Sequence, residues 1–114
     1  MIDCLFCKIV AGEIPADIIH ETDTTVAFRD INPQAPTHVL IIPRKHIATI
    51  NDIEDEDREI IGSLYTAARD IAVAEGIADE GYRVIMNCNA AAGQTVFHVH
   101  LHLIGGRPMT WPPG

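Results

Sequence analysis

The sequence predicts an α+β domain, built from an antiparallel sheet of about five strands with one long and one short helix. The first observation is an apolar pattern with helical spacing between residues 54 and 75. The second is a series of short apolar runs, separated by turn residues, which are typical of strands. The third is that most connections are short, which favours antiparallel neighbours. The helical pattern comprises Ile60, Ile61, Leu64, Ala67, Ala68, Ile71 and Ala72.

The elements can be placed in order along the chain. We expect helices over residues 3–11 and 54–75, and strands over residues 18–21, 25–29, 38–43, 82–87 and 96–104. Acidic residues crowd the start of the long helix, where the helix dipole favours them, and Gly76 ends it. Prolines exclude regular structure from residues 32–36 and from the tail after residue 104. We expect the helices to cover one face of the sheet and the histidines to occupy the other.

Size and composition limit the classes of function. With 114 residues we expect a single domain spanning residues 1–114. The formal net charge of −8 disfavours binding to polynucleotides, because the counterion release that drives such binding needs a basic surface. No apolar run is long enough to span a membrane, and we expect neither a signal peptide nor a membrane partner. The protein is therefore expected in the cytoplasm, where its three cysteines are thiols or metal ligands.

Three of the six histidines stand at alternate positions, as His98, His100 and His102. The residues between and around them are apolar, so a strand here has one apolar face and one face with three imidazoles. Imidazole exchanges protons near neutral pH and is also a nucleophile and a metal ligand. The pattern therefore indicates either a metal site or a nucleophilic site.

The preceding loop, Gly93-Gln94-Thr95, favours the nucleophilic reading. Residues i and i+4 of a strand lie roughly 13 Å apart, which is too far for one ion to bind all three histidines easily. Backbone amides, the Gln94 amide and the Thr95 hydroxyl are donors suited to phosphate oxygens. We expect the middle histidine, His100, to attack phosphorus, with His102 binding phosphate or passing protons.

Several segments together resemble the histidine-triad (HIT) family, in its Hint branch. They are the His-x-His-x-His motif, residues 30–38, 42–47 and 93–97, and the ending Trp111-Pro112-Pro113-Gly114. The resemblance implies a purine nucleoside phosphoramidase, which cleaves AMP or GMP from an amine through a nucleotidyl-histidine. It also implies the HIT-like fold, with the sheet continued across a homodimer and Trp111 reaching the partner's site.

The resemblance assigns roles to individual residues. His100 is the nucleophile, His102 contacts phosphate, His98 is the third catalytic histidine of the triad and His38 supports the triad from a neighbouring strand. Asp30 and Ile31 lie at the ribose, and Thr95 stands where the family most often has serine. The expected wall around the base is Phe6, Ile9, Ile14 and Phe28, and the expected phosphate side is Asn87, Gly93, Gln94 and Thr95.

The pair Cys4-x-x-Cys7 opens the short predicted helix. Alone it is ambiguous between a redox pair and half of a zinc site, although redox pairs usually follow a strand. The resemblance to bacterial-type members implies structural zinc at Cys4, Cys7, His46 and His98, with no cofactor needed for catalysis. The alternative is two partly buried thiols that pack the helix. On the zinc interpretation His98 is a ligand rather than a catalytic residue.

Three functions remain to be distinguished. The first is the phosphoramidase and the second is a dinucleoside polyphosphate hydrolase, against which the Trp-Pro-Pro-Gly ending argues. The third is a nucleotide-binding interaction protein whose catalysis is incidental.

Overall fold

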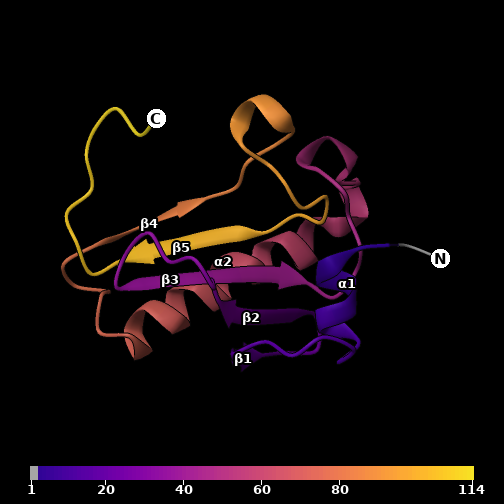
Figure 1. Cartoon of the computed structure of the whole chain (residues 1–114), viewed down its shortest axis with the longest axis horizontal. Coiled ribbons are helices and arrows are strands. Elements are labelled where there is room, and N and C mark those ends of the chain that lie inside the picture. The colour runs from indigo at the N-terminus through magenta and orange to yellow at the C-terminus, as the bar shows by residue number, and fades with distance from the viewer. Residues whose placement is uncertain (1–2) are drawn as a thin grey trace.

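The computed structural model describes residues 3–114, which form one five-stranded antiparallel sheet (Figure 1). The strand order across the sheet is β1-β2-β3-β5-β4, so β1 and β4 are its edges. β3 lies at the centre and every residue in it is buried. The predicted antiparallel sheet of five strands is confirmed. Its strands are β1 (Ile18–Glu21), β2 (Thr25–Arg29), β3 (Thr37–Pro43), β4 (Tyr82–Ile85) and β5 (Leu101–Gly105).

Two α-helices accompany the sheet, as predicted: the short α1 (Leu5–Val10) and the long α2 (Arg58–Ala74). Two 3-10 turns, Ile50–Asp52 and Asp55–Asp57, precede α2, and the second of them occupies the start of the predicted long helix. A left-handed glycine, Gly76 with φ of 75°, ends it. A third 3-10 turn, Ala90–Ala92, lies in the loop between β4 and β5. No helix of residues 3–114 is long and apolar enough to cross a membrane.

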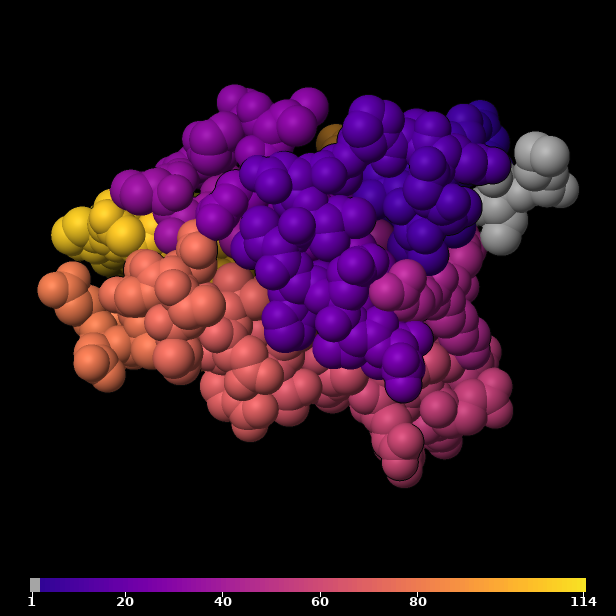
Figure 2. All heavy atoms as spheres, turned by 90° about the horizontal axis from the view of Figure 1, so that it is seen from below, coloured from indigo at the N-terminus to yellow at the C-terminus, as the bar shows by residue number. Residues whose placement is uncertain are grey.

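The helices lie on opposite faces of the sheet, and our expectation of one helical face was wrong. Alternation along β3 sends Val39 and Ile41 into the core under α2, while Leu40 and Ile42 pack with α1. α1 buries Phe6 and Ile9 on this second face because they stand three residues apart. Figure 2, seen from below, shows the two helical sides of the molecule, with the indigo N-terminal residues on one side and α2 on the other.

The histidine strand is shorter than predicted. β5 begins at Leu101, so His98 and His100 lie before the strand and only His102 lies in it. The register between β3 and β5 ends at the pair Ile41 and Leu101, two residues before Pro43, the last residue of β3, which has no N–H to give to a neighbouring strand. The backbone N–H of Val99 instead donates to the carbonyl of Ile47 at 2.7 Å. The three imidazoles therefore do not share one regular strand face.

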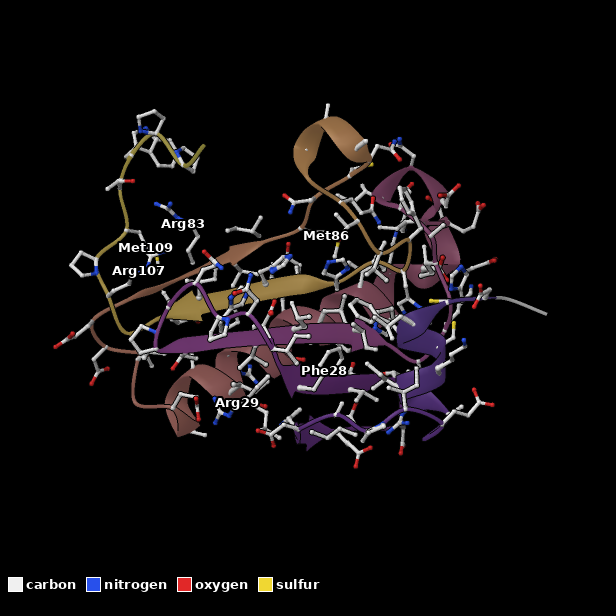
Figure 3. All side chains as sticks on the ribbon, in the orientation of Figure 1. Phe28, Arg29, Arg83, Met86, Arg107 and Met109 are labelled. Atoms are coloured by element: carbon white, nitrogen blue, oxygen red, sulfur yellow. The ribbon has the colours of Figure 1, made fainter. Side chains whose placement is uncertain are left out.

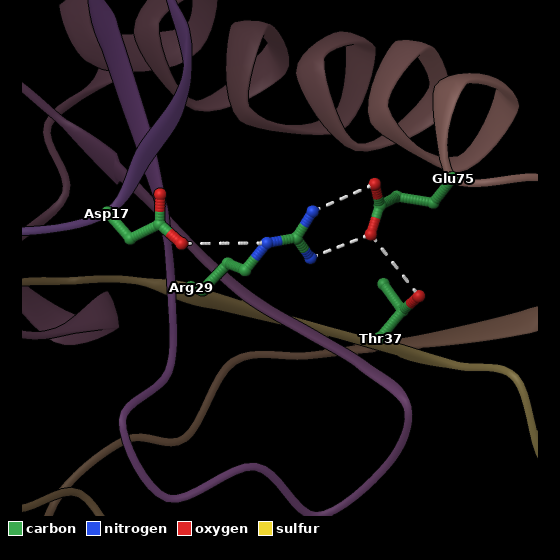
Figure 4. Close-up of polar contacts among 4 residues, drawn as sticks. All are labelled: Asp17, Arg29, Thr37 and Glu75. Atoms are coloured by element: carbon green, nitrogen blue, oxygen red, sulfur yellow. Dashed lines mark hydrogen bonds and ion pairs between the residues drawn. The ribbon is translucent and has the colours of Figure 1, made fainter.

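A polar network ties the end of α2 to the sheet (Figure 4). The Arg29 guanidinium of β2 donates to both carboxylate oxygens of Glu75, at 2.7 and 3.0 Å. Asp17 lies 3.8 Å from Arg29 Nε, and the Thr37 hydroxyl donates to Glu75 at 3.4 Å. The hydrogen bonds from Arg29 lower the pKa of Glu75. The network fixes the start of β3, the strand that carries His38.

Replacing Glu75 by glutamine tests this network. We expect Glu75→Gln to lower the free energy of unfolding by about 1 kcal/mol at pH 7, because it removes a partly exposed two-point ion pair. The carboxylate pKa is lower in the folded chain, so its contribution is present above the unfolded pKa and disappears as pH falls through the folded value. The stabilities from denaturant unfolding of both proteins should therefore converge as the pH falls below the lowered pKa of Glu75 in the folded chain. Glu80→Gln, at an exposed position, is the control; equal losses in both variants would contradict the account.

Candidate active site

Two members of the triad, His100 and His102, lie together where β5 begins, on the face of the sheet opposite α2. His102 pairs with Leu40 of β3 and points to the same face as His38. The ring centroids of His100 and His102 lie 5.0 Å apart, and those of His38 and His102 lie 5.2 Å apart. His98 turns away towards α1 and the loop that follows β3, where its ring lies 5.1 Å from that of His46. His38, predicted from the resemblance, thus joins His100 and His102.

One hydrogen bond defines the state of His100. Its Nδ1 lies 2.8 Å from the carbonyl oxygen of His98. A carbonyl only accepts, so Nδ1 carries the proton and the neutral ring has its lone pair on Nε2. Burial lowers the pKa of His100 and keeps this ring uncharged at neutral pH. The arrangement provides a nucleophilic nitrogen in a fixed orientation.

His102 is oriented by a chain of hydrogen bonds that starts at the backbone of Gln34. The Gln34 N–H donates to His38 Nδ1 at 3.0 Å, so the neutral His38 ring carries its proton on Nε2. That Nε2 lies 3.0 Å from His102 Nδ1 and donates to it. The remaining proton of His102 is therefore on Nε2. Burial, then the neighbouring His100 and His38, lower the pKa of His102 to about 4, so this ring is a neutral donor.

The loop after β2 places a carboxylate beside this chain. Asp30 Oδ1 accepts the backbone N–H of Asn32 at 2.8 Å, and Oδ2 lies 3.4 Å from His38 Nε2. The side chain is 18% exposed, so the carboxylate can still be reached from solvent. Its neighbour Ile31 is fully exposed on the same loop. A carboxylate accepts several hydrogen bonds at once, which suits it to a pair of neighbouring hydroxyls.

The loop before the triad differs from expectation at Gln94. Its Nε2 donates to the carbonyls of Ala48 and Val96, at 2.9 and 3.1 Å, and its Oε1 accepts from the Asn89 N–H at 2.8 Å. The side chain is buried and both its protons are used, so our expectation that it donates to phosphate was wrong. Gln94 instead holds the loop in place. Gly93 has φ of 96°, a conformation that favours glycine, and Thr95 is exposed.

The apolar residues expected around a base lie beside the nucleophile. Phe6 packs edge-on against Phe28, with centroids 5.4 Å apart, and against His100 at 5.1 Å. Phe6, Ile9 and Phe28 are buried in one cluster, and Ile14 is partly buried against it. Asn87 is half-buried in the segment after β4. Trp111 is 82% exposed on the tail, away from the core.

Cys4, Cys7, His46 and His98 bring four donor atoms within 4.8 Å of one another. The Cys4 and Cys7 sulfurs both lie 3.5 Å from His98 Nδ1, which is 3.3 Å from His46 Nδ1. A tetrahedral zinc ion with usual bond lengths separates such donors by about 3.3–3.6 Å. His98 Nε2 donates to the carbonyl of Pro43 at 2.8 Å, which leaves the Nδ1 lone pair facing the cluster. The donor set and its orientation therefore fit a metal ion.

A second group, Asp30, His38 and His102, is also compact but suits a different role. The Gln34 N–H occupies the lone pair on His38 Nδ1, so His38 presents a proton rather than a lone pair to the group. This group is arranged to pass hydrogen bonds to His102. The two clusters thus differ at one histidine each, because His98 directs a lone pair into its cluster whereas His38 directs a proton into its own.

Sequence reasoning missed the backbone groups that set these protonation states. They are the carbonyls of Pro43 and His98 and the N–H of Gln34. Backbone groups leave no residue-type signal, so only the path of the chain could reveal them. Arg107, which donates to the Gln34 carbonyl at 2.9 Å, was also missed, because its sequence neighbourhood gives no sign of a distant partner.

Comparison with known proteins agrees with this geometry. The model of the family described as "HIT domain" matches residues 11–109. A purine nucleoside phosphoramidase of Escherichia coli (strain K12) is 52% identical over 107 residues, which cover 94% of this chain and 90% of that protein. An uncharacterized HIT-like protein of Synechocystis is 48% identical over 98% of this chain and 97% of its own length.

Solved structures give the same result. A HIT family hydrolase from Legionella pneumophila superposes with a TM-score of 0.96 at 58% identity, over 98% of this chain and all of that one. A HIT family hydrolase from Clostridium thermocellum superposes with a TM-score of 0.93 at 48% identity, over 96% of each chain. Fold, triad and sequence therefore agree, and this chain belongs to the HIT family.

Proposed function

We propose that the protein hydrolyses purine nucleoside 5′-phosphoramidates through a nucleotidyl intermediate on His100. The observation that carries the proposal is the hydrogen bond from His100 Nδ1 to the His98 carbonyl, which leaves Nε2 free to attack. The 52% identity to a purine nucleoside phosphoramidase supports the choice of substrate. The enzyme is thus a hydrolase of P–N bonds.

The reaction has two steps. In the first, His100 Nε2 forms a bond to the α-phosphorus while the bond from phosphorus to the amine breaks, and the amine leaves with a proton. His102 Nε2, which the hydrogen-bond chain from Gln34 keeps as a neutral donor, hydrogen-bonds a phosphate oxygen, and the amine takes its proton from water. In the second, water attacks the phosphorus and releases His100 and the nucleoside monophosphate. Because His100 is neutral and fixed, no proton has to leave it before attack.

We propose that the nucleotide lies along the same face. Asp30 accepts the ribose hydroxyls and Ile31 covers the sugar. The apolar cluster at α1 and β2 encloses the base, and Asn87, Gly93 and Thr95 lie on the phosphate side. Three observations support this placement of the nucleotide. They are the position of Asp30 beside His38, the exposure of Thr95 and the contact of Phe6 with His100. The base-side residues are Phe6, Ile9, Ile14 and Phe28.

Replacing the nucleophile tests the function. We expect His100→Ala to lower the turnover of an AMP–lysine amide by roughly 10³-fold or more, because no other group can form the covalent intermediate. Release of AMP should be followed for both proteins with the amide and with a diadenosine polyphosphate. His20→Ala, on β1, is the control and should retain wild-type turnover.

Each alternative function gives a different result in this assay. Faster turnover of the diadenosine polyphosphate than of the amide would contradict the proposal in favour of a polyphosphate hydrolase. Binding of AMP with no turnover of either substrate would contradict it in favour of an interaction protein.

We propose that Cys4, Cys7, His46 and His98 bind one structural zinc ion. The donor spacing and the orientation of His98 support this site. A hollow lined by Cys4 and His46 lies beside these donors. Zinc bound there would tie α1 to the segment before β5.

We also propose that the protein is cytoplasmic. Its three cysteines are free thiols, as is usual for proteins of that compartment.

Metal analysis tests the zinc site. Protein purified without chelator should contain about one zinc per chain, and Cys7→Ser should lose most of it, because a hydroxyl is a poor zinc ligand. Cys88→Ser, outside the cluster, should keep the wild-type content. A zinc content near zero in the unaltered protein would contradict the assignment.

We propose a homodimer whose sheet continues through β4. This strand pairs with β5 on one side and forms an edge of the sheet, which leaves backbone groups open to another strand. Tyr65 on α2 and Tyr82 on β4 are exposed, at 53% and 37%, and aromatic residues of this kind are enriched at interfaces. The exposed Trp111 lies on the tail that would reach the second subunit.

Sedimentation tests the dimer. At micromolar concentration the chain should sediment at twice the mass of one chain, 12.5 kDa, and a species of monomer mass would contradict the proposal.

A further inference from the structure

Two arginines differ from the other cationic side chains of this acidic chain. Among residues 3–114, six of the eight lysines and arginines have a carboxylate within 4.0 Å, whereas Arg83 and Arg107 do not. They donate instead to main-chain carbonyls. Figure 3 shows both guanidinium groups beside Met109, between β4 and the C-terminal tail. Their donors are thus used to hold the backbone rather than to neutralise charge.

The two arginines hold different segments. Arg83 of β4 donates to the Thr110 carbonyl at 2.9 Å and so fixes the tail alone. Arg107 donates through Nε to the Gln34 carbonyl at 2.9 Å and through Nη1 to the Pro108 carbonyl at 3.2 Å. Arg107 therefore connects the tail to the loop between β2 and β3.

Close packing at Gly106 brings Arg107 to that loop. Gly106 has φ of 89°, and a Cβ built there would lie 3.0 Å from the Cβ of Pro36. A larger residue would have to push the loop away, and the backbone conformation also favours glycine. The tail thus leaves β5 directly against the loop, and the next side chain, Arg107, reaches the Gln34 carbonyl.

Gln34 is the residue that sets the proton on His38. If its N–H moved away, His38 could carry its proton on Nδ1, because the competing donor would be gone. His38 Nε2 would then accept from His102 Nδ1 rather than donate to it. His102 Nε2 would lose its proton and would present a lone pair to the substrate instead of a donor.

We propose that Arg107 is a positioning residue for the triad, which acts by holding Gln34 so that its N–H keeps the proton of His38 on Nε2. The link runs from the Arg107 guanidinium through Gln34 and His38 to His102, with each contact between 2.9 and 3.0 Å. This role rests on the proposed function only where it concerns turnover. The protonation of His38 is a property of the protein without substrate.

The variant Arg107→Gln tests the link, with Arg83→Gln as the matched control. Both remove one guanidinium, but only Arg107 contacts the Gln34 carbonyl. Long-range ¹H–¹⁵N NMR of the labelled full-length protein at neutral pH reports which nitrogen of each histidine carries the proton. We expect His38 to be protonated on Nε2 in the wild type and in Arg83→Gln. In Arg107→Gln we expect a larger fraction of His38 to be protonated on Nδ1 than in the wild type.

Kinetics with the AMP–lysine amide provide the second readout. We expect Arg107→Gln to lower kcat about fivefold, within the range that one hydrogen bond allows, and to change KM less than twofold. Unchanged His38 signals in Arg107→Gln would overturn the inference, as would the same change of signals in Arg83→Gln. Because the NMR experiment contains no substrate, it tests the inference even if the protein fails to hydrolyse any phosphoramidate.

Discussion

The hydrogen bond from His100 Nδ1 to the carbonyl of His98 is the contact on which the site depends. It assigns the proton to one ring nitrogen and leaves the other free, and it fixes the direction of that free lone pair. Burial keeps the ring neutral, so a nucleophile exists at neutral pH without a separate base to generate it. Without this bond the His100 ring could rotate or move its proton to Nε2. The hydrogen-bond donors beside it would then have no nucleophile in a fixed position.

His98 joins the cluster of Cys4, Cys7 and His46 to the nucleophile because its side chain and its backbone have different partners. The ring directs Nδ1 to Cys4, Cys7 and His46, while the carbonyl accepts the proton of His100. Whatever holds the ring in place therefore also holds the carbonyl. The opposite side of the triad follows the same logic, since the Gln34 backbone orients His38 and thereby His102. Backbone groups on both sides therefore give the three imidazoles of the triad different orientations and different roles.

Much of the fold could be predicted from the sequence, because helical and strand periodicities are local properties. The five strands, both helices and the grouping of His38 with the triad were expected. The position of α1 was not, since alternation along β3 creates two apolar faces and the sequence does not say which helix covers which. The late start of β5 at Leu101 and the use of the Gln94 side chain to hold its loop depend on partners far along the chain. Such partners are set by tertiary structure rather than by residue type.

The most direct measurement is the protonation state of His100 in the full-length protein, by long-range ¹H–¹⁵N NMR at neutral pH. A proton on Nδ1 and a free lone pair on Nε2 are expected, because the His98 carbonyl can only accept. The same state should persist in His102→Ala, which leaves the His98 carbonyl in place. A His100 ring protonated on Nε2, or charged at neutral pH, would contradict the account.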